Sequence, residues 1–164
     1  MTKIIYRHYG TDKYCLEDFQ CYGSELLSNK PAGGLWGSRA DATAGWKGFC
    51  IGNQFRTNSL NKYFDFALKN SANVYTISTE SDLLRLPMRE LPEIISPIVP
   101  EIASFIWKYL PDYDKCIEQG IDAVELCWFG VEFSDVAKDP IPRLLPLWDC
   151  DSIVVLNQDI VVPL

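Results

Sequence analysis

The apolar run Ser152-Ile153-Val154-Val155-Leu156 decides the fold class, because its β-branched residues favour extended structure. A second strand-like segment, Lys3 to Tyr9, lies at the other end of the sequence. Most helix-like segments fall between these two strands, so helices and strands are segregated and do not strictly alternate. Segregation of this kind favours an α+β fold with a mixed or antiparallel central sheet flanked by helices. We therefore predict one domain over residues 1–164, a length typical of a single domain.

Hydrophobic periodicity predicts the elements between these ends. Strands are expected at residues 33–38, 73–77, 121–128 and 160–162, and helices at 43–49, 58–70, 79–86, 101–110 and 113–119. Ser38 or Asp41 is a candidate cap for the first helix, and Gly120 is expected to end the last one. Residues 10–32 are expected to form a long loop with at most a helical turn. Four prolines between residues 87 and 100 predict an irregular segment there.

Composition excludes several classes of function. With 15 basic and 22 acidic residues the net charge is −7, which argues against a general nucleic-acid binder but leaves a local basic site open. The single histidine, His8, rules out an HExxH motif and any two-histidine zinc site, so no metal is expected. None of the six cysteines forms a CxxC pair, which favours buried free thiols in a reducing compartment. Without a signal peptide or a long apolar run, we expect a soluble, cytoplasmic protein with no membrane partner.

Three segments carry residues that are suited to chemistry. Tyr6–Thr11 places His8 at a strand end before a glycine, either in a site or satisfied by the backbone. Lys30–Asp41 has two glycines before Trp36, which suit either close approach of the backbone to a ligand or a tight turn beside a core tryptophan. Trp148–Asn157 has carboxylates at the mouth of a strand, where they are either catalytic or part of a solvated turn.

Together these segments resemble the ADP-ribosyltransferase fold family, which contains the poly(ADP-ribose) polymerases and the diphtheria-type toxins. His8-Tyr9-Gly10-Thr11 is similar to the family's HG[ST]-like motif with one residue inserted. The run 32–41, followed by 43–50, is similar to the GxGIYFAD motif and its small-residue helix. This alignment puts Trp36 at the position of the nicotinamide-stacking tyrosine and Ser38 near a hydroxyl position. Asp151, before the strand at 152–155, resembles the glutamate that opens a late strand in the family.

The resemblance implies NAD as a substrate and assigns roles to the matching residues. His8 would bind a ribose hydroxyl, Trp36 would stack on nicotinamide, and Asp151 would stabilise the ribose cation that forms during transfer. The backbone at Gly34 would reach the carboxamide. The implied catalytic residues are Asp151, His8 and Trp36, and the implied NAD-binding residues are His8, Tyr9, Gly10, Gly34, Leu35, Trp36 and Ser38. Arg7 or Arg39 would meet the pyrophosphate, unless both are only surface charges.

Two departures from the family pattern bear on activity. Trp36 keeps an aromatic face but lacks the hydroxyl of tyrosine, and Asp151 is one methylene shorter than glutamate. Rival carboxylates are Glu125, Asp149 and Glu132.

We therefore expect an NAD-dependent mono-ADP-ribosyltransferase that acts on a macromolecular acceptor, as a toxin or a phage or defence-related effector. The alternative is a catalytically degenerate acidic interaction protein, an inhibitor or nucleic-acid mimic, that binds a basic protein. A cysteine enzyme that pairs His8 with Cys15 or Cys50 is a third, weaker hypothesis.

Overall fold

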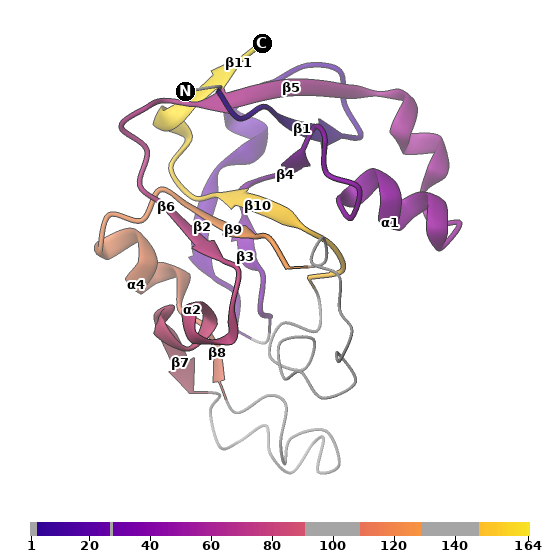
Figure 1. The fold of residues 1–164 in the computed structure, drawn as a ribbon. Coiled ribbons are helices and arrows are strands. Elements are labelled where there is room, and N and C mark those ends of the chain that lie inside the picture. The colour runs from indigo at the N-terminus through magenta and orange to yellow at the C-terminus, as the bar shows by residue number, and fades with distance from the viewer. Residues whose placement is uncertain (1–2, 27, 91–108, 129–147) are drawn as a thin grey trace.

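A mixed seven-stranded sheet organises the computed structural model, which describes residues 3–26, 28–90, 109–128 and 148–164 (Figure 1). The strands in chain order are β1 (Tyr6–Tyr9), β4 (Leu35–Arg39), β5 (Tyr63–Leu68), β6 (Val74–Ile77), β9 (Ala123–Leu126), β10 (Ser152–Val155) and β11 (Val161–Pro163). Their spatial order is β11-β5-β1-β4-β10-β9-β6. All neighbours pair antiparallel except β6 and β9, which are parallel. The predicted α+β class with a mixed sheet is confirmed.

Smaller elements surround this sheet. Two short antiparallel pairs are β2 (Cys21–Ser24) with β3 (Pro31–Gly33), and β7 (Met88–Glu90) with β8 (Tyr109–Pro111). The helices in the described ranges are α1 (Trp46–Gly52), α2 (Glu80–Arg85) and α4 (Tyr113–Glu118), with short 3₁₀ turns η1 (Leu16–Phe19), η2 (Thr57–Asn61) and η5 (Gln158–Ile160). Figure 1 shows α2 and α4 on one side of the sheet and α1 at the opposite end. None of the helices in these ranges is long and apolar enough to cross a bilayer.

Apolar side chains cover both faces of the central strands. All four residues of β9 and all four of β10 are buried, as expected for strands packed on both sides. Val154 belongs to the cluster packed under α2 and α4, whereas Ile153 and Val155 belong to the cluster formed with Phe64 and Phe66 of β5. The alternation of side chains along β10 therefore divides the core into two halves, one on each face of the sheet.

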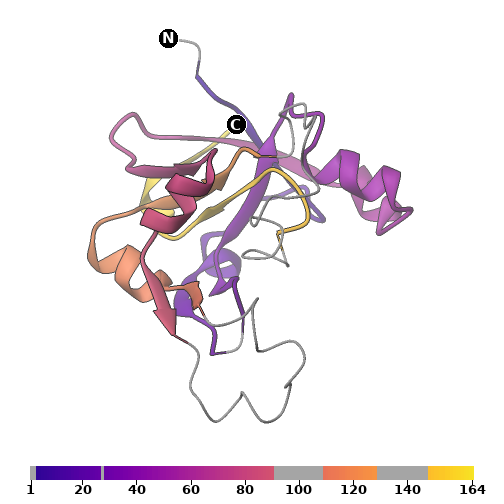
Figure 2. The same ribbon diagram turned by 60° about the horizontal axis from the view of Figure 1, so that its bottom comes forward.

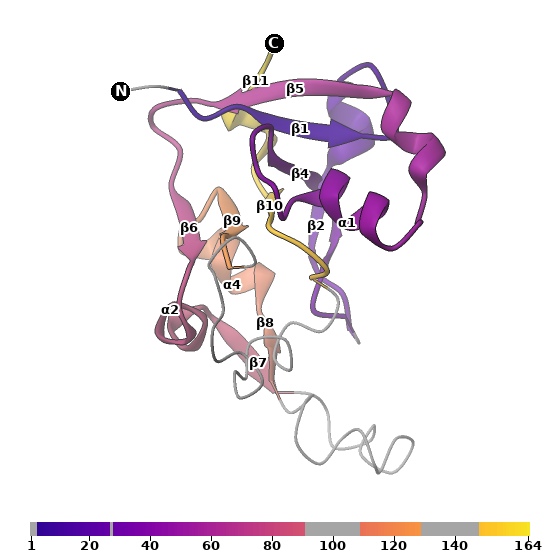
Figure 3. The same ribbon diagram turned by 45° about the vertical axis from the view of Figure 1, so that its right-hand side comes forward.

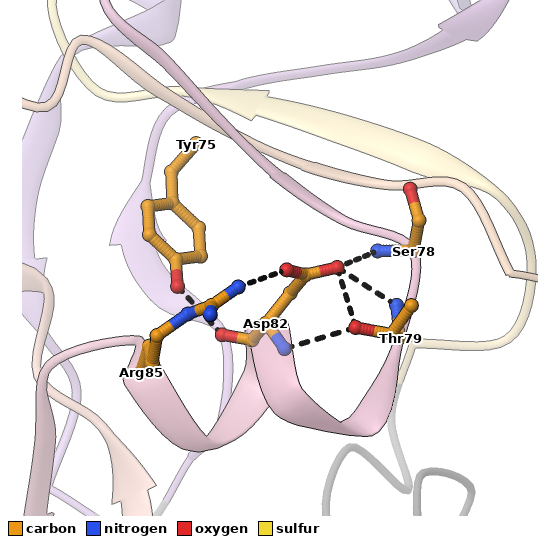
Figure 4. Close-up of polar contacts among 5 residues, drawn as sticks. All are labelled: Tyr75, Ser78, Thr79, Asp82 and Arg85. Carbon is orange, nitrogen blue, oxygen red and sulfur yellow. Dashed lines mark hydrogen bonds and ion pairs between the residues drawn. The ribbon is translucent and has the colours of Figure 1, made fainter.

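The start of α2 follows directly from its sequence. The Thr79 hydroxyl accepts the backbone N–H of Asp82 at 3.2 Å, and the Asp82 carboxylate accepts the N–H of Thr79 at 2.9 Å (Figure 4). This reciprocal capping box satisfies two backbone donors that the first turn of a helix leaves unpaired. Arg85 donates to the same carboxylate at 2.6 Å, and the Tyr75 hydroxyl donates to the Asp82 carbonyl at 2.6 Å. The helix predicted from Thr79 onward is confirmed.

The helix predicted at residues 58–70 is wrong. The chain forms η2 and then β5, whose Phe64 and Phe66 are buried while Tyr63 is exposed. The apolar residues fit a period of two as well as a helical period, and aromatic residues favour strands. Pairing with β1 on one side and β11 on the other decides between the two.

The bounds of other helices and strands also differ from the predicted ones. The expected loop at 10–32 contains η1, β2 and β3, and the first helix begins at Trp46. The helix at 113–119 is confirmed as α4, and Gly120 follows it with φ +72°. Of the expected helix at 101–110, residues 101–108 lie outside the described ranges and the last two belong to β8.

Candidate functional site

A cavity of about 600 Å³ lies where β1, β4 and β10 meet the segments around α1 and η2. Five residues of the predicted NAD-binding set line it: His8, Tyr9, Gly10, Trp36 and Ser38. The other lining residues are Arg7, Lys30, Gly37, Trp46, Arg56, Asn58, Ser59, Trp148, Asp149, Cys150 and Ser152. The volume lies within the range of sites for small molecules and cofactors.

The pairing of β1 with β4 brings His8 beside Trp36. The register pairs Tyr6 with Arg39 and Arg7 with Ser38, so the two segments approach each other although 28 residues separate them in the sequence. The Nδ1 atom of His8 lies 2.6 Å from the backbone oxygen of Trp36. Their rings lie on opposite faces of the sheet, because His8 shares a face with Tyr6 and its partner Phe64, whereas Trp36 shares a face with its partner Val154.

The contacts of His8 fix its tautomer. A carbonyl oxygen only accepts hydrogen bonds, so Nδ1 carries the proton and Nε2 carries a lone pair in the neutral ring. The ring packs against Phe19 and Phe64 at centroid distances of 5.0 and 5.2 Å. Burial lowers the pKa of His8 below its ordinary value of 6.5, and the bond to Trp36 opposes part of that shift. At neutral pH, His8 is therefore an uncharged side chain that can accept a hydrogen bond at Nε2.

Two indole rings form one wall of the cavity. Trp36 and Trp148 meet edge to face with centroids 4.9 Å apart. The Trp148 Nε1–H donates to the carbonyl of Asn29 at 3.2 Å, and the Tyr113 hydroxyl donates to the same oxygen at 2.7 Å. The Asn29 carbonyl thus connects Trp148 with Tyr113, so hydrogen bonds as well as packing hold this wall of the cavity in place.

Charged groups lie along the same wall. The Lys30 ammonium is 5.5 Å from the centroid of the Trp36 ring and 4.0 Å from a carboxylate oxygen of Asp149. Arg7 lines the cavity from β1 and makes two bonds of 2.6 and 2.8 Å to the Asp65 carboxylate. The cavity therefore combines flat aromatic surface with cationic groups, which suit an aromatic ligand carrying phosphates, and both cations are paired with carboxylates, Arg7 with Asp65 and Lys30 with Asp149.

Ser38 lines the cavity but is engaged by the protein. Its hydroxyl donates to the carbonyl of Asp151 at 2.8 Å and accepts the backbone N–H of Trp46 at 2.9 Å. The prediction that Ser38 or Asp41 is the N-cap of α1 is wrong, because Gly45 occupies that position; the Ser38 hydroxyl, on β4, instead accepts the N–H of the first helical residue. Ser38 connects β4, the start of β10 and the start of α1.

Asp151 does not line the large cavity. It borders a second cavity of about 350 Å³, together with Glu125, Arg39 and Cys127. Its carboxylate accepts the backbone N–H of Trp128 at 2.6 Å. Glu125 is buried and receives two bonds of 2.7 and 2.8 Å from Arg39. Of the rival carboxylates Asp149 is the one that lines the large cavity, and Glu132 lies outside the described residues.

Gly34 and Leu35, two residues of the predicted NAD-binding set, do not line the large cavity and instead pack within the sheet. Leu35 is completely buried in the core. Gly34 has φ +85°, and a side chain there would place its Cβ 2.9 Å from Val154 and 3.1 Å from the backbone oxygen of Val155. The backbone does make a close approach at this glycine, as its sequence position suggested, but the approach is to β10.

Sequence reasoning missed one side of the cavity. Trp46, Arg56, Asn58 and Ser59 line it from α1 and η2. The last two fell inside the helix wrongly predicted at 58–70, so no site was expected there. Trp148 was available in the sequence as the aromatic neighbour of Asp149.

Within the part of the chain that the structure describes, the cysteines and the possible metal ligands form no second centre. All six cysteines, each within the described ranges, are free thiols. Neither Cys15 nor Cys50 lines the cavity beside His8, so the cysteine-enzyme hypothesis gains no geometric support. Cys150 does line it, but burial raises the pKa of its thiol to about 12, so it is protonated at neutral pH. Within the described residues, no group of three or more His, Cys, Asp or Glu side chains is placed to hold a metal.

Comparisons of the chain with protein-family models, with curated proteins and with solved structures found no match.

Proposed function

We propose that the large cavity binds NAD and that the protein transfers mono-ADP-ribose to a macromolecular acceptor. The observation that carries the proposal is that three residues suited to NAD, namely His8, Trp36 and Asp149, line the same cavity. The resemblance of the 8–11 and 32–50 segments to ADP-ribosyltransferases supports it independently of this geometry.

The residues of the cavity suit the parts of NAD. The Trp36 and Trp148 wall offers a face on which a nicotinamide or adenine ring can stack. The Nε2 lone pair of His8 accepts a ribose hydroxyl only if the ribose passes the end of β1 to the face that carries the His8 ring. Lys30 and Arg7 provide positive charge for the pyrophosphate.

Asp149 supplies the carboxylate in this proposal, in place of Asp151. Transfer breaks the bond between ribose C1′ and the nicotinamide nitrogen, and its electron pair leaves with neutral nicotinamide. The ribose carries developing positive charge, which a nearby carboxylate stabilises. A nucleophile of the acceptor then bonds to C1′, and its proton passes to solvent. Asp151 is occupied by the Trp128 N–H at 2.6 Å and borders the other cavity.

One set of contacts favours the alternative, an acidic interaction protein without catalysis. Glu125 and Asp151, two of the carboxylates near the ends of the central strands, are engaged with Arg39 and Trp128. If Asp149 does not act on NAD, the net charge of −7 would suit binding to a basic protein.

Thermal unfolding with and without millimolar NAD tests binding, and release of nicotinamide tests transfer. A ligand at a hundredfold excess over Kd stabilises the folded state by about 2.7 kcal/mol. For a domain of this size, that raises Tm by about 5–10 °C. We expect this shift in the unmodified protein and in Asp149→Asn, whereas nicotinamide release is lost only in Asp149→Asn. Asp159→Asn, at an exposed site on η5, is the matched control.

Each outcome separates the two functions. Binding of NAD without nicotinamide release, in the presence of candidate acceptors, would favour the interaction protein. No Tm shift at several times the cellular NAD level would remove NAD from the proposal.

A further inference from the structure

The segment 42–64, which we call the arm, differs in charge from the rest of the chain. It holds Lys47, Arg56 and Lys62 and no Asp or Glu, in a protein of net charge −7. It forms α1, η2 and the start of β5, and Figures 1 and 3 show α1 and η2 side by side at the end of the sheet away from α2 and α4. Figure 2 shows the same segment at the right of the molecule. The arm is thus a local basic surface on an acidic protein.

An exposed aromatic ring lies beside a guanidinium on this surface. Phe55 is 43% exposed, and the Arg56 guanidinium carbon is 5.3 Å from its ring centroid. Trp46 and Phe49 support Phe55 from the protein side, edge to face at 6.0 and 6.2 Å. Lys47 is exposed next to Trp46 in the sequence. Phe55 therefore presents aromatic surface to solvent from a base of other aromatic rings.

A second exposed aromatic ring beside a guanidinium lies at the start of β5. Tyr63 is 44% exposed, and the Arg7 guanidinium carbon is 3.9 Å from its ring centroid. Exposed Lys62 precedes it, and the Lys62 backbone oxygen accepts the N–H of Gly10 at 2.8 Å. The arm thus carries two exposed rings, each with a guanidinium beside it.

The turn that carries Phe55 is held in an unusual conformation. Gln54 and Arg56, on either side of it, have φ +53° and +47°, a region that non-glycine residues rarely adopt. The N–H groups of Gln54 and Phe55 bond to the carbonyls of Ile51 and Cys50 at 3.3 and 2.9 Å. Strained backbone of this kind is concentrated at functional sites. Here it fixes the position of an exposed aromatic ring that the core does not require.

We propose that the arm binds single-stranded nucleic acid, with bases stacked on Phe55 and Tyr63 and phosphates held by Lys47, Arg56 and Lys62. Aromatic rings beside cations are the features by which proteins bind single strands without reading sequence, because every base has a flat face. An acidic peptide would use the cations but would gain little from exposed rings. The acidic remainder of the surface repels phosphate, so contact is confined to the arm.

This inference does not rest on NAD binding. Phe55, Lys47 and Lys62 do not line the cavity, whereas Arg56 does. A strand on the arm would therefore pass the mouth of the cavity, whatever the cavity holds.

The test is fluorescence anisotropy with labelled single strands of about 12 nucleotides, as DNA and as RNA, a length within the range of about 4–16 nucleotides that single-strand-binding OB-fold domains cover. The variants are Phe55→Ala, Lys62→Gln and Tyr63→Ala. Leu84→Ala and Lys115→Gln are matched controls, because both side chains are exposed on α2 and α4 at the other side of the molecule. Circular dichroism and thermal unfolding show that each variant is folded.

We expect binding that Phe55→Ala weakens about tenfold, as for the loss of one stacked base, and that both controls leave unchanged. The slope of log affinity against log salt should fall by about 0.7 in Lys62→Gln, as for the loss of one phosphate contact. Equal binding of DNA and RNA fits stacking and phosphate contacts, and a preference for either identifies the physiological strand.

Two results would overturn the proposal. One is an absence of binding to either strand at low salt. The other is binding that polyglutamate displaces as well as unlabelled single strands do and that Phe55→Ala leaves intact, which would identify the arm as a simple cationic surface for acidic peptides.

Discussion

The imidazole Nδ1 of His8 is hydrogen bonded at 2.6 Å to the backbone oxygen of Trp36, which joins the two residues that the sequence marked most clearly as a site. The bond crosses from β1 to β4 just beyond the last pair of their ladder, Arg7 with Ser38. The bond therefore extends the pairing of β1 with β4 by one contact, and it leaves Nε2 as the ring nitrogen that can accept a hydrogen bond. These two roles of His8 can be separated by substitution.

His8→Asn is expected to keep the structural role and lose the binding role. The Asn amide nitrogen can occupy the position of Nδ1 and donate to Trp36, but no atom replaces Nε2. Both His8→Asn and His8→Ala lose the ring contacts with Phe19 and Phe64, but only His8→Ala also loses the bond to Trp36, so we expect a loss within about 1 kcal/mol for Asn and a larger one, about 2 kcal/mol, for Ala. Urea unfolding measures both, and NAD titration should show weaker binding in each. Undiminished NAD affinity in His8→Asn would exclude Nε2 from the ligand.

Acid should destabilise the protein partly through His8. Its pKa is lower in the folded state than its ordinary value of 6.5, so between these values the unfolded chain binds more protons and stability rises with pH. The contribution is complete above about pH 6.5 and is lost as pH falls, with a slope of at most about 1.4 kcal/mol per pH unit for one proton. The lowered pKa of Asp82, bonded to Thr79, acts in the same direction but only at pH values below its ordinary value of 3.8. Urea unfolding from about pH 7.5 to about pH 5 should therefore show a shallower loss in His8→Asn, and parallel curves would contradict the role of His8.

Removing one partner of the Arg39–Glu125 pair should destabilise the protein more than removing the charges of both partners. The Glu125 side chain is 4% exposed and the Arg39 side chain is 37% exposed, and two bonds of 2.7 and 2.8 Å join them. Arg39→Met leaves a buried carboxylate without its main partner, which we expect to cost about 3 kcal/mol, at the low end for buried pairs because Arg39 is partly solvated. The double variant Arg39→Met, Glu125→Gln should recover at least half of that loss in urea unfolding. A double variant as unstable as Arg39→Met would mean that packing, and not the charge, explains the cost.

The parts of the fold that the sequence predicted are those set by local signals. The capping box at Thr79 and Asp82 and the apolar run at 152–156 specify α2 and β10 without help from the rest of the chain. β5 was misread because its type depends on partners that the local sequence does not show, β1 and β11. The short strands β2 and β3 carry no such run and form by pairing with each other.

The residues of the site also fall into those that local sequence signals predicted and those that depend on tertiary contacts. His8 and Trp36 could be marked from the glycine-containing motifs around them, and both line the large cavity. The choice between Asp149 and Asp151 could not be made, because both residues precede β10, where the regular alternation of a strand does not set the direction of a side chain. The contribution of Arg56 and Asn58 was hidden because it requires η2 to fold against α1, a tertiary contact.

Ser38 should control the start of α1 and, through it, one side of the cavity. Its hydroxyl joins the Asp151 carbonyl to the Trp46 N–H, so Ser38→Ala leaves both groups without that partner. We expect a loss of about 1–2 kcal/mol in urea unfolding, against less than about 0.5 for Ser81→Ala, an exposed serine of α2.

Gly45→Ala should disturb the same point by overpacking. Its Cβ would lie 2.8 Å from the Ser38 Cβ and 3.1 Å from the hydroxyl oxygen, so α1 must move, at a cost of about 1–3 kcal/mol. Gly52→Ala, with nothing within 4 Å of the added Cβ, is the matched control. Because Trp46 lines the cavity and also supports Phe55, both Gly45→Ala and Ser38→Ala should weaken NAD and single-strand binding together. If these variants weaken only NAD binding, the arm is positioned independently of the start of α1.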